Sequence, residues 1–100
     1  MEIKWWYEPK SNTPKEQCPC CDYISLPERW TYLICPICFW EDEYGIDVDN
    51  IDEISWPNHI SLREARENFK DFWACDKNMI KNVISIEERK KYTKRERSIN

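Results

Sequence analysis

Apolar residues recur with helical spacing in one stretch of the chain, residues 61–74. Positions three and four residues apart share one face of a helix, and that face holds Leu62, Ala65, Phe69, Phe72 and Trp73. Charged residues fill most of the other positions, and Ser61 with Glu64 forms a capping box at the start. The pattern predicts an amphipathic helix over residues 61–74 whose apolar face packs on the core.

Two shorter runs are rich in β-branched and aromatic residues instead. They cover residues 23–26 and 30–34, and Pro27-Glu28-Arg29 supplies a turn between them. We expect a β-hairpin here, with Phe39-Trp40 as a third strand or an extended segment. A further strand-like run at residues 3–7 is expected to join this sheet or to cover its core.

Beyond residue 74 the apolar pattern weakens. Residues 79–84 hold a short helix-compatible cluster, and Ser85 with Glu88 forms a second capping box. This box predicts a terminal helix that runs through Arg97 with nearly all of its faces polar. We therefore expect one domain over residues 1–84 and a basic, helical tail over residues 85–100.

The strongest chemical signal is a pair of Cys-x-x-Cys turns, each opening with Cys-Pro and separated by 13 residues. Each turn holds two sulfurs on one side of a tight loop, and two facing turns complete the tetrahedral four-thiolate shell of structural zinc. The predicted Zn²⁺ ligands are Cys18, Cys21, Cys35 and Cys38. The expected fold class is small α+β, a zinc ribbon made of the β-hairpin and two cysteine knuckles, with one amphipathic helix and a C-terminal helix.

The length of 100 residues fits one domain, and a domain this small commonly adds a metal or disulfides to its core. The N-terminal residues do not contain the apolar segment that a signal peptide requires. No apolar run in the sequence is long enough to cross a membrane. We therefore expect a cytoplasmic location. In that reducing compartment clustered cysteines bind metal more often than they form disulfides, so a disulfide framework is the less favoured alternative.

Two cysteines and one histidine remain outside this ligand set. Cys20 lies inside the first knuckle, but only Cys18 and Cys21 have the spacing that lets two thiolates converge from one turn. We expect Cys20 to be a small buried side chain, because neighbouring thiolates would disfavour a reactive one. Cys75 is expected in the core or at the helix end. His59 is expected to make a local hydrogen bond before the helix, rather than to act in catalysis or ligation.

Charge is distributed unevenly along the chain, whose net charge is −4. Residues 1–84 carry 9 Lys and Arg against 16 Asp and Glu, whereas residues 85–100 carry 6 against 3. Residues 41–53 are the most acidic stretch, and they predict either a solvated loop or a patch for a basic partner. A calcium loop fits poorly, because Asp47, Asp49 and Asn50 lack the central Gly of that pattern.

Three blocks of the sequence resemble the cysteine-rich CPCC proteins of bacteria. They are Cys-Pro-Cys-Cys followed by Asp22 and Tyr23, then Ile-Cys-Pro-Ile-Cys-Phe-Trp-Glu-Asp, then Pro-Asn-His-Ile-Ser-Leu-Arg-Glu-Ala-Arg-Glu-Asn-Phe. The resemblance covers roughly residues 17–75. It implies a small zinc-ribbon-like domain with the four knuckle cysteines as ligands, and no established reaction or substrate. The chain departs from it in its basic tail and at Asp22, where such knuckles usually carry Gly because φ is positive there.

These features support three hypotheses for function. The first is a small, non-enzymatic zinc-binding protein that acts as a protein–protein interaction module, such as an inhibitor or immunity-type partner, through the acidic loop 41–53 or its helix faces. The second is a nucleic-acid-associated zinc ribbon that uses the basic tail. The third is a thiol-dependent enzyme or redox protein that uses Cys20, Cys75 or His59. We favour the first, because a closed four-thiolate shell leaves no open catalytic position. No membrane partner is expected.

Overall fold

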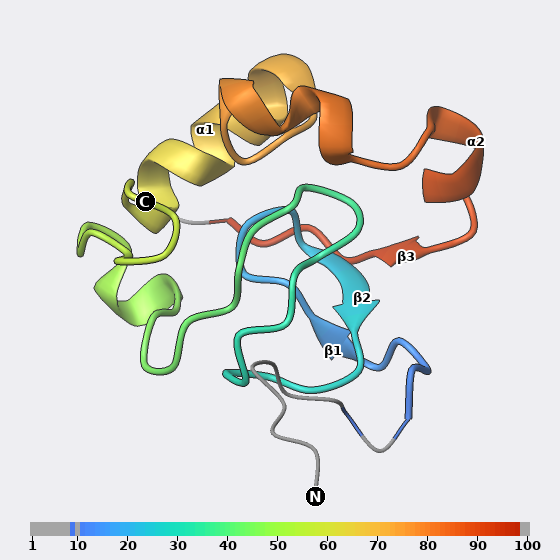
Figure 1. Cartoon of the computed structure of the whole chain (residues 1–100), viewed down its shortest axis with the longest axis horizontal. Helices are drawn as coiled ribbons and strands as arrows, with labels where there is room; N and C mark the ends of the chain where they lie inside the picture. Colours follow the sequence, from blue (N-terminus) through green and yellow to red (C-terminus); the bar gives the residue numbers. More distant parts are fainter. Residues whose placement is uncertain (1–8, 10, 99–100) are drawn as a thin grey trace, which may run out of the picture.

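A small antiparallel sheet carries the first knuckle. The computed structural model of the chain describes residue 9 and residues 11–98. Strands β1 (Glu16–Gln17), β2 (Tyr23–Leu26) and β3 (Thr93–Lys94) form a sheet in the order β1-β2-β3 (Figure 1). The connection between β1 and β2 is the first Cys-x-x-Cys turn, so the hairpin itself presents two of the sulfurs.

The prediction of a hairpin between residues 23–26 and 30–34 is wrong, because β2 pairs with β1 and β3 instead. Residues 30–34 form an irregular segment with one isolated bridge, between Ile34 and Glu41. Trp30 and Tyr32 have φ of 59° and 63°, which interrupts an extended strand. A third strand at Phe39-Trp40 is also absent from the structure.

Buried Asp42 explains why a segment of high β-propensity is not a strand here. Its carboxylate accepts hydrogen bonds from the backbone N–H of Trp30 at 2.6 Å and from Nε of Arg29 at 3.0 Å. The Asp42 side chain is fully buried, and a buried charge is tolerated only when it is paired in this way. The backbone conformation at Trp30 is therefore set by its hydrogen bond to a carboxylate 12 residues away.

Helix α1 (Leu62–Phe72) confirms the predicted amphipathic helix, although it ends before residue 74. Its N-cap is Ser61, whose Oγ accepts a hydrogen bond from the Glu64 N–H at 3.2 Å. The buried positions are Leu62, Ala65 and Phe69. Trp73 ends the helix as its left-handed C-cap and stays 45% exposed, so the expectation that it belongs to the buried face is wrong.

The C-terminal part contains less helix than expected. The 3-10 helix η2 (Lys77–Asn82) follows α1, and α2 (Ile86–Arg89) ends after one turn. The prediction of a helix through Arg97 is wrong beyond Arg89, because Thr93–Lys94 forms β3 beside β2. A domain boundary between residues 84 and 85 stays a prediction.

The core lies where the knuckles meet α1. Figure 1 shows α1 and η2 on one side of the molecule, above the sheet and its loops. The largest fully buried side chains include Trp40, Leu26, Ile37 and Leu62, and they pack in one cluster with the knuckle cysteines. A short 3-10 helix, η1 (Val48–Asn50), interrupts the acidic loop. In the described part of the chain no helix has the length and apolar character to span a membrane. The strand-like run at residues 3–7 lies outside the described residues.

Candidate metal centre

The first knuckle is a tight turn closed by backbone hydrogen bonds at both ends. The N–H of Cys18 donates to the carbonyl of Tyr23 at 2.9 Å, and the N–H of Asp22 donates to the carbonyl of Cys18 at 3.1 Å. Asp22 has a φ of 67°, in the left-handed region. Asp tolerates this region better than most residues, which is how the turn forms without glycine.

The second knuckle repeats the same geometry outside the sheet. The N–H of Cys35 donates to the carbonyl of Trp40 at 2.9 Å, and the N–H of Phe39 donates to the carbonyl of Cys35 at 2.8 Å. Phe39 has a φ of 70° and takes the place that Asp22 has in the first knuckle. Each turn therefore presents its two sulfurs in the same way, one from each end.

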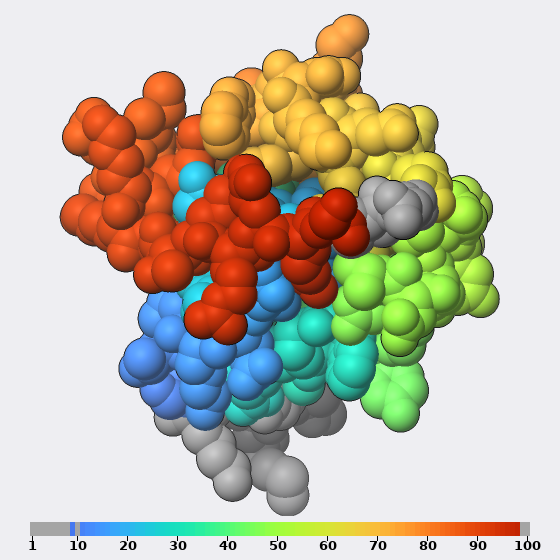
Figure 2. Space-filling view, turned by 180° about the vertical axis from the view of Figure 1, so that it is seen from behind, coloured from blue at the N-terminus to red at the C-terminus, as the bar shows by residue number. Residues whose placement is uncertain are grey.

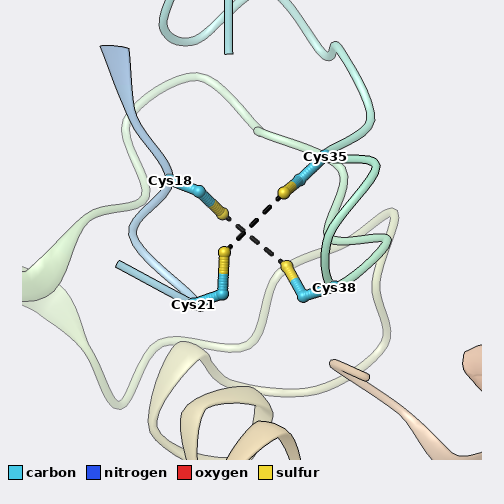
Figure 3. Close-up of side chains that lie close together, drawn as sticks. All are labelled: Cys18, Cys21, Cys35 and Cys38. Atoms are coloured by element: carbon cyan, nitrogen blue, oxygen red, sulfur yellow. Dashed lines mark hydrogen bonds between the residues drawn. The ribbon is translucent and has the colours of Figure 1, made fainter. Parts of the chain in front are cut away.

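The two knuckles face each other and bring all four predicted sulfurs together (Figure 3). The sulfurs of Cys18, Cys21, Cys35 and Cys38 lie within 4.8 Å of one another. The Cys18–Cys38 and Cys21–Cys35 sulfur pairs are 3.7 Å and 3.8 Å apart. A tetrahedral shell with metal–sulfur bonds of about 2.3 Å places its sulfurs roughly 3.8 Å from one another. The cluster therefore has the size and donor set for one metal ion.

The same distances bear on the disulfide alternative. A disulfide requires sulfurs about 2.05 Å apart, whereas these pairs are separated by 3.7 Å or more. All six cysteines are free in the structure. The four cluster sulfurs belong to residues that are 0–2% exposed, so a bound ion would be enclosed by protein on all sides.

Electrostatics disfavour four thiolates in this cluster when no cation is present. Burial raises the pKa of Cys18 to about 11 and raises the pKa values of Cys21 and Cys38 well above their ordinary value. Burial acts in the same direction on Cys35, but hydrogen bonds from the three neighbouring thiols and from Ser25 outweigh it and hold the Cys35 pKa well below that value. Four thiolates would repel one another in so buried a site. A metal cation offsets that repulsion and favours the deprotonated form.

Ser25 is a contributor that sequence reasoning missed. It lies on β2, is 3% exposed, and its Oγ is 3.0 Å from the sulfur of Cys35. A hydroxyl donor at this distance stabilises a thiolate and orients it. No spacing rule identifies Ser25, because the contact depends on how β2 passes the second knuckle.

A buried group of charges braces the first knuckle, and the sequence analysis did not predict it. Asp22 accepts from both terminal nitrogens of Arg66 at 2.7 Å and 2.9 Å, and from Nε of Arg97 at 2.9 Å. Arg66 also donates to the carbonyl of Pro19, and Arg97 to that of Cys18. Burial raises the pKa of Asp22, but the contacts with the two arginines outweigh it and hold that pKa below its ordinary value.

These contacts hold the C-terminal segment against the first knuckle. Figure 2 shows the last described residues, in red, crossing the middle of one face between blue residues on one side and orange and yellow residues on the other. The N–H of Arg95 donates to the carbonyl of Asp22 at 3.0 Å, next to the β2–β3 pairing. The basic tail is therefore partly structural, since Arg97 is used to hold the knuckle.

The remaining candidates lie outside the four-sulfur cluster. Cys20 is buried beside it, and Cys75 is buried with its N–H donating to the carbonyl of Cys38 at 2.8 Å. Burial raises the pKa of the Cys75 thiol, which disfavours the thiolate. The backbone N–H of His59 donates to the carbonyl of Ser55 at 2.8 Å, and a hydrogen bond of its side chain stays a prediction. The His59 ring is exposed and contacts Trp56.

The acidic loop 41–53 is less uniform than a solvated loop. Asp42 is buried with Arg29, and Asp47 caps η1 and pairs with the same arginine at 3.2 Å. Asp52 forms an ion pair with Arg63 at the surface. The other carboxylates of the loop form no ion pair within residues 11–98, and they are Glu41, Glu43, Asp49 and Glu53.

Comparison with known proteins yields one match. The family model described as "Cysteine-rich CPCC" matches residues 16–90, three quarters of the chain. The match includes both knuckles, α1 and α2, and it extends beyond the three blocks quoted above. No curated protein and no solved structure matches the chain.

Proposed function

The chain belongs to the cysteine-rich CPCC family, and from that premise we propose that it is a zinc-binding, non-enzymatic protein whose role is to bind another protein. Zinc is the usual metal of closed structural sites made of four cysteines in a tetrahedral arrangement. We further propose that the protein works in the cytoplasm, where a reducing environment keeps the thiols available to the metal.

The enclosure of the sulfurs supports a structural role for zinc. Catalytic zinc sites keep an open position for water or substrate, whereas structural sites are closed by four protein ligands. Here all four ligands come from protein and are almost completely buried. The two thiols outside the shell, Cys20 and Cys75, are buried as well. These features support a protein without a catalytic centre at its cysteines.

The observation that carries the interaction role is the position of the exposed apolar side chains. Nine large apolar side chains are exposed in the described part of the chain, and six of them lie between residues 30 and 56. We call these six the aromatic face: Trp30, Tyr32, Ile34, Tyr44, Ile54 and Trp56. Trp56 and Tyr44 are 81% and 74% exposed. Contiguous patches of exposed apolar side chains mark interaction sites.

Contacts between the segments support treating these residues as one surface. The rings of Trp30 and Tyr44 are 6.4 Å apart, edge to face. The N–H of Tyr32 donates to the carbonyl of Asp42, which joins residues 30–34 to the acidic loop. A carboxylate oxygen of Glu43 accepts from the N–H of Trp56 at 3.0 Å, which joins that loop to residues 55–58.

Nucleic-acid binding by the basic tail has less support. Three of its lysines lie beside glutamates, with Lys90–Glu87, Lys91–Glu88 and Lys94–Glu96 separations of 3.3–3.4 Å. Arg97 and Arg89 are largely buried, the latter over the ring of Trp73 at 4.3 Å. A nucleic-acid binder usually presents a clustered, open basic face.

A comparative capture experiment tests the interaction role. The zinc-loaded protein, the double variant Tyr44→Ser/Trp56→Ser and the control Ile80→Ser/Ile86→Ser serve as bait in host-cell extract treated with nuclease. The control removes two exposed apolar side chains outside the aromatic face. We expect the same protein to be captured by wild type and control and lost with the first variant. A captured protein that is retained by both variants, or capture that requires intact nucleic acid, contradicts the proposal.

A further inference from the structure

A small cavity opens beside the aromatic face, between the second knuckle and η2. Its volume is about 210 Å³. The lining combines four apolar side chains with two carboxylates: Ile34, Phe39, Pro57, Met79, Glu41 and Asp76. No Lys or Arg is among the lining residues. Pockets for drug-sized molecules measure roughly 300–1,000 Å³, so this one suits a single side chain.

The two carboxylates of the pocket, Glu41 and Asp76, form no ion pair within the described residues. Burial and the neighbouring carboxylate of Glu43 raise the pKa of Glu41. Both effects disfavour the charged form of Glu41, and a cation placed beside its carboxylate would favour that form.

We propose that this pocket receives the Lys or Arg side chain of a partner protein. The inference rests on the proposed function, that the chain binds another protein, and it adds the chemistry of the partner. The apolar walls take the aliphatic stem, and the carboxylates of Glu41 and Asp76 take the charged head. Long basic side chains bury their stems along apolar surface in this manner, and Arg is frequent among the residues that dominate binding energy.

Neighbouring aromatic groups complete the site. The ring of His59, which also lines the pocket, lies 6.3 Å from the ring of Trp56. Trp56 therefore stands beside the opening with most of its surface exposed. An indole is the best aromatic partner for a cation, and near this opening it would attract the same basic segment.

The test uses two synthetic peptides that differ in one charge. Acetyl-Gly-Leu-Arg-Leu-Gly-amide and its citrulline counterpart, which is neutral and nearly the same shape, are titrated into the zinc-loaded protein in the millimolar range. Binding is followed by ¹H–¹⁵N chemical shifts. We expect the arginine peptide to shift the resonances of Ile34, Asn58 and Met79, and the citrulline peptide to bind roughly fivefold more weakly. Absence of shifts in the pocket, or equal binding of both peptides, overturns the proposal.

Matched variants separate the pocket from general charge attraction. Glu41→Gln and Glu67→Gln each remove one negative charge, and Glu67 is exposed on α1 away from the pocket lining. We expect Glu41→Gln to weaken arginine-peptide binding roughly fivefold and Glu67→Gln to leave it nearly unchanged. Asp76→Asn, which keeps an oxygen to cap the N–H of Asn78, is expected to weaken it as well. Equal effects of the Glu41 and Glu67 changes overturn the proposal.

The two proposals fail in different ways. If the extract experiment finds a partner that depends on the aromatic face but Glu41→Gln still captures it, the pocket assignment is wrong and the interaction role stands. If the arginine peptide occupies the pocket but no captured protein depends on the aromatic face, the interaction role is wrong.

Discussion

Asp22 shows how much one residue of the first knuckle contributes. It adopts the left-handed conformation that closes the turn, and its carboxylate also holds Arg66 of α1 and Arg97 of the C-terminal segment. A glycine there would favour the turn but would remove the group that both arginines bind. The choice of Asp therefore links the metal centre to two distant parts of the chain.

Arg97 tests this link. We expect Arg97→Ala to lower the free energy of unfolding of the zinc-loaded protein by about 1–3 kcal/mol, because hydrogen bonds to a charged and largely buried partner are lost. Asp22 keeps its contacts with Arg66, which limits the loss. Urea denaturation followed by tryptophan fluorescence measures the effect.

Arg95→Ala is the matched control. It also removes one positive charge from the segment, but Arg95 contacts Asp22 and Gln17 only through its backbone. We expect a loss close to zero for this exposed side chain. Equal losses in the two variants would show that Arg97 acts only through net charge.

Ser25 provides a second prediction for a single residue. Ser25→Ala removes the hydroxyl that lies 3.0 Å from the Cys35 sulfur. We expect zinc affinity to fall by roughly tenfold, the lower end of the loss when a group that hydrogen-bonds a metal ligand is removed. Competition with a chromophoric chelator measures the zinc affinity. The control is Ser11→Ala, which changes an exposed serine. An affinity equal to that of wild type would refute a role for Ser25 in the metal centre.

Helices α1 and α2 have the same kind of N-cap but differ in how many of their residues are buried. Ser61 and Ser85 each accept a hydrogen bond from the N–H three residues on, both at 3.2 Å. Helix α1 has 11 residues and buries three of them, whereas α2 has four residues and buries Arg89 alone. Capping of α1 therefore contributes to the whole fold, and capping of α2 contributes mainly to a local turn.

This difference predicts unequal effects of the same substitution. We expect Ser61→Ala to lower the free energy of unfolding by about 1 kcal/mol, the usual value of an N-cap. Ser85→Ala is expected to cost less than roughly half of that, because α2 can open without the core. Thermal denaturation of the two variants measures the two losses of stability. A larger loss for Ser85→Ala would mean that α2 and β3 contribute more to the fold than α1.

For the whole molecule, the metal is expected to decide whether the core forms. The knuckle cysteines belong to the same buried cluster as Leu26, Trp40 and Leu62, so a bound ion would lie within the apolar core. Burial and mutual repulsion of the thiolates oppose this arrangement when no cation is present. Metal-binding free energy is folding free energy in domains of this kind.

Zinc removal is the corresponding experiment. We expect chelation to abolish the cooperative thermal transition and the near-ultraviolet circular dichroism of the tryptophans. Cys38→Ala is expected to lose zinc and fold together, whereas Cys20→Ala keeps one zinc per chain at a modest cost in stability. An unchanged spectrum in metal-free protein would refute the structural role of zinc.

Some parts of this protein follow from short stretches of sequence. The four-cysteine cluster depends on two turns of four residues, and α1 depends on a cap and a repeat of apolar positions within 12 residues. Such patterns are set by local backbone geometry, which is why spacing alone identified them. The family resemblance rested on the same blocks.

Other parts depend on residues that are distant in the sequence and meet only in the folded chain. The partners of β2 lie on both sides of it, and Arg97 reaches Asp22 across 75 residues. Asp42 overrides the β-propensity of residues 30–34 because its buried charge must be paired. The pocket around Glu41 likewise combines the second knuckle, the loop before α1 and η2. Pairing and burial are properties of the whole packed molecule, so only the tertiary structure reveals these features.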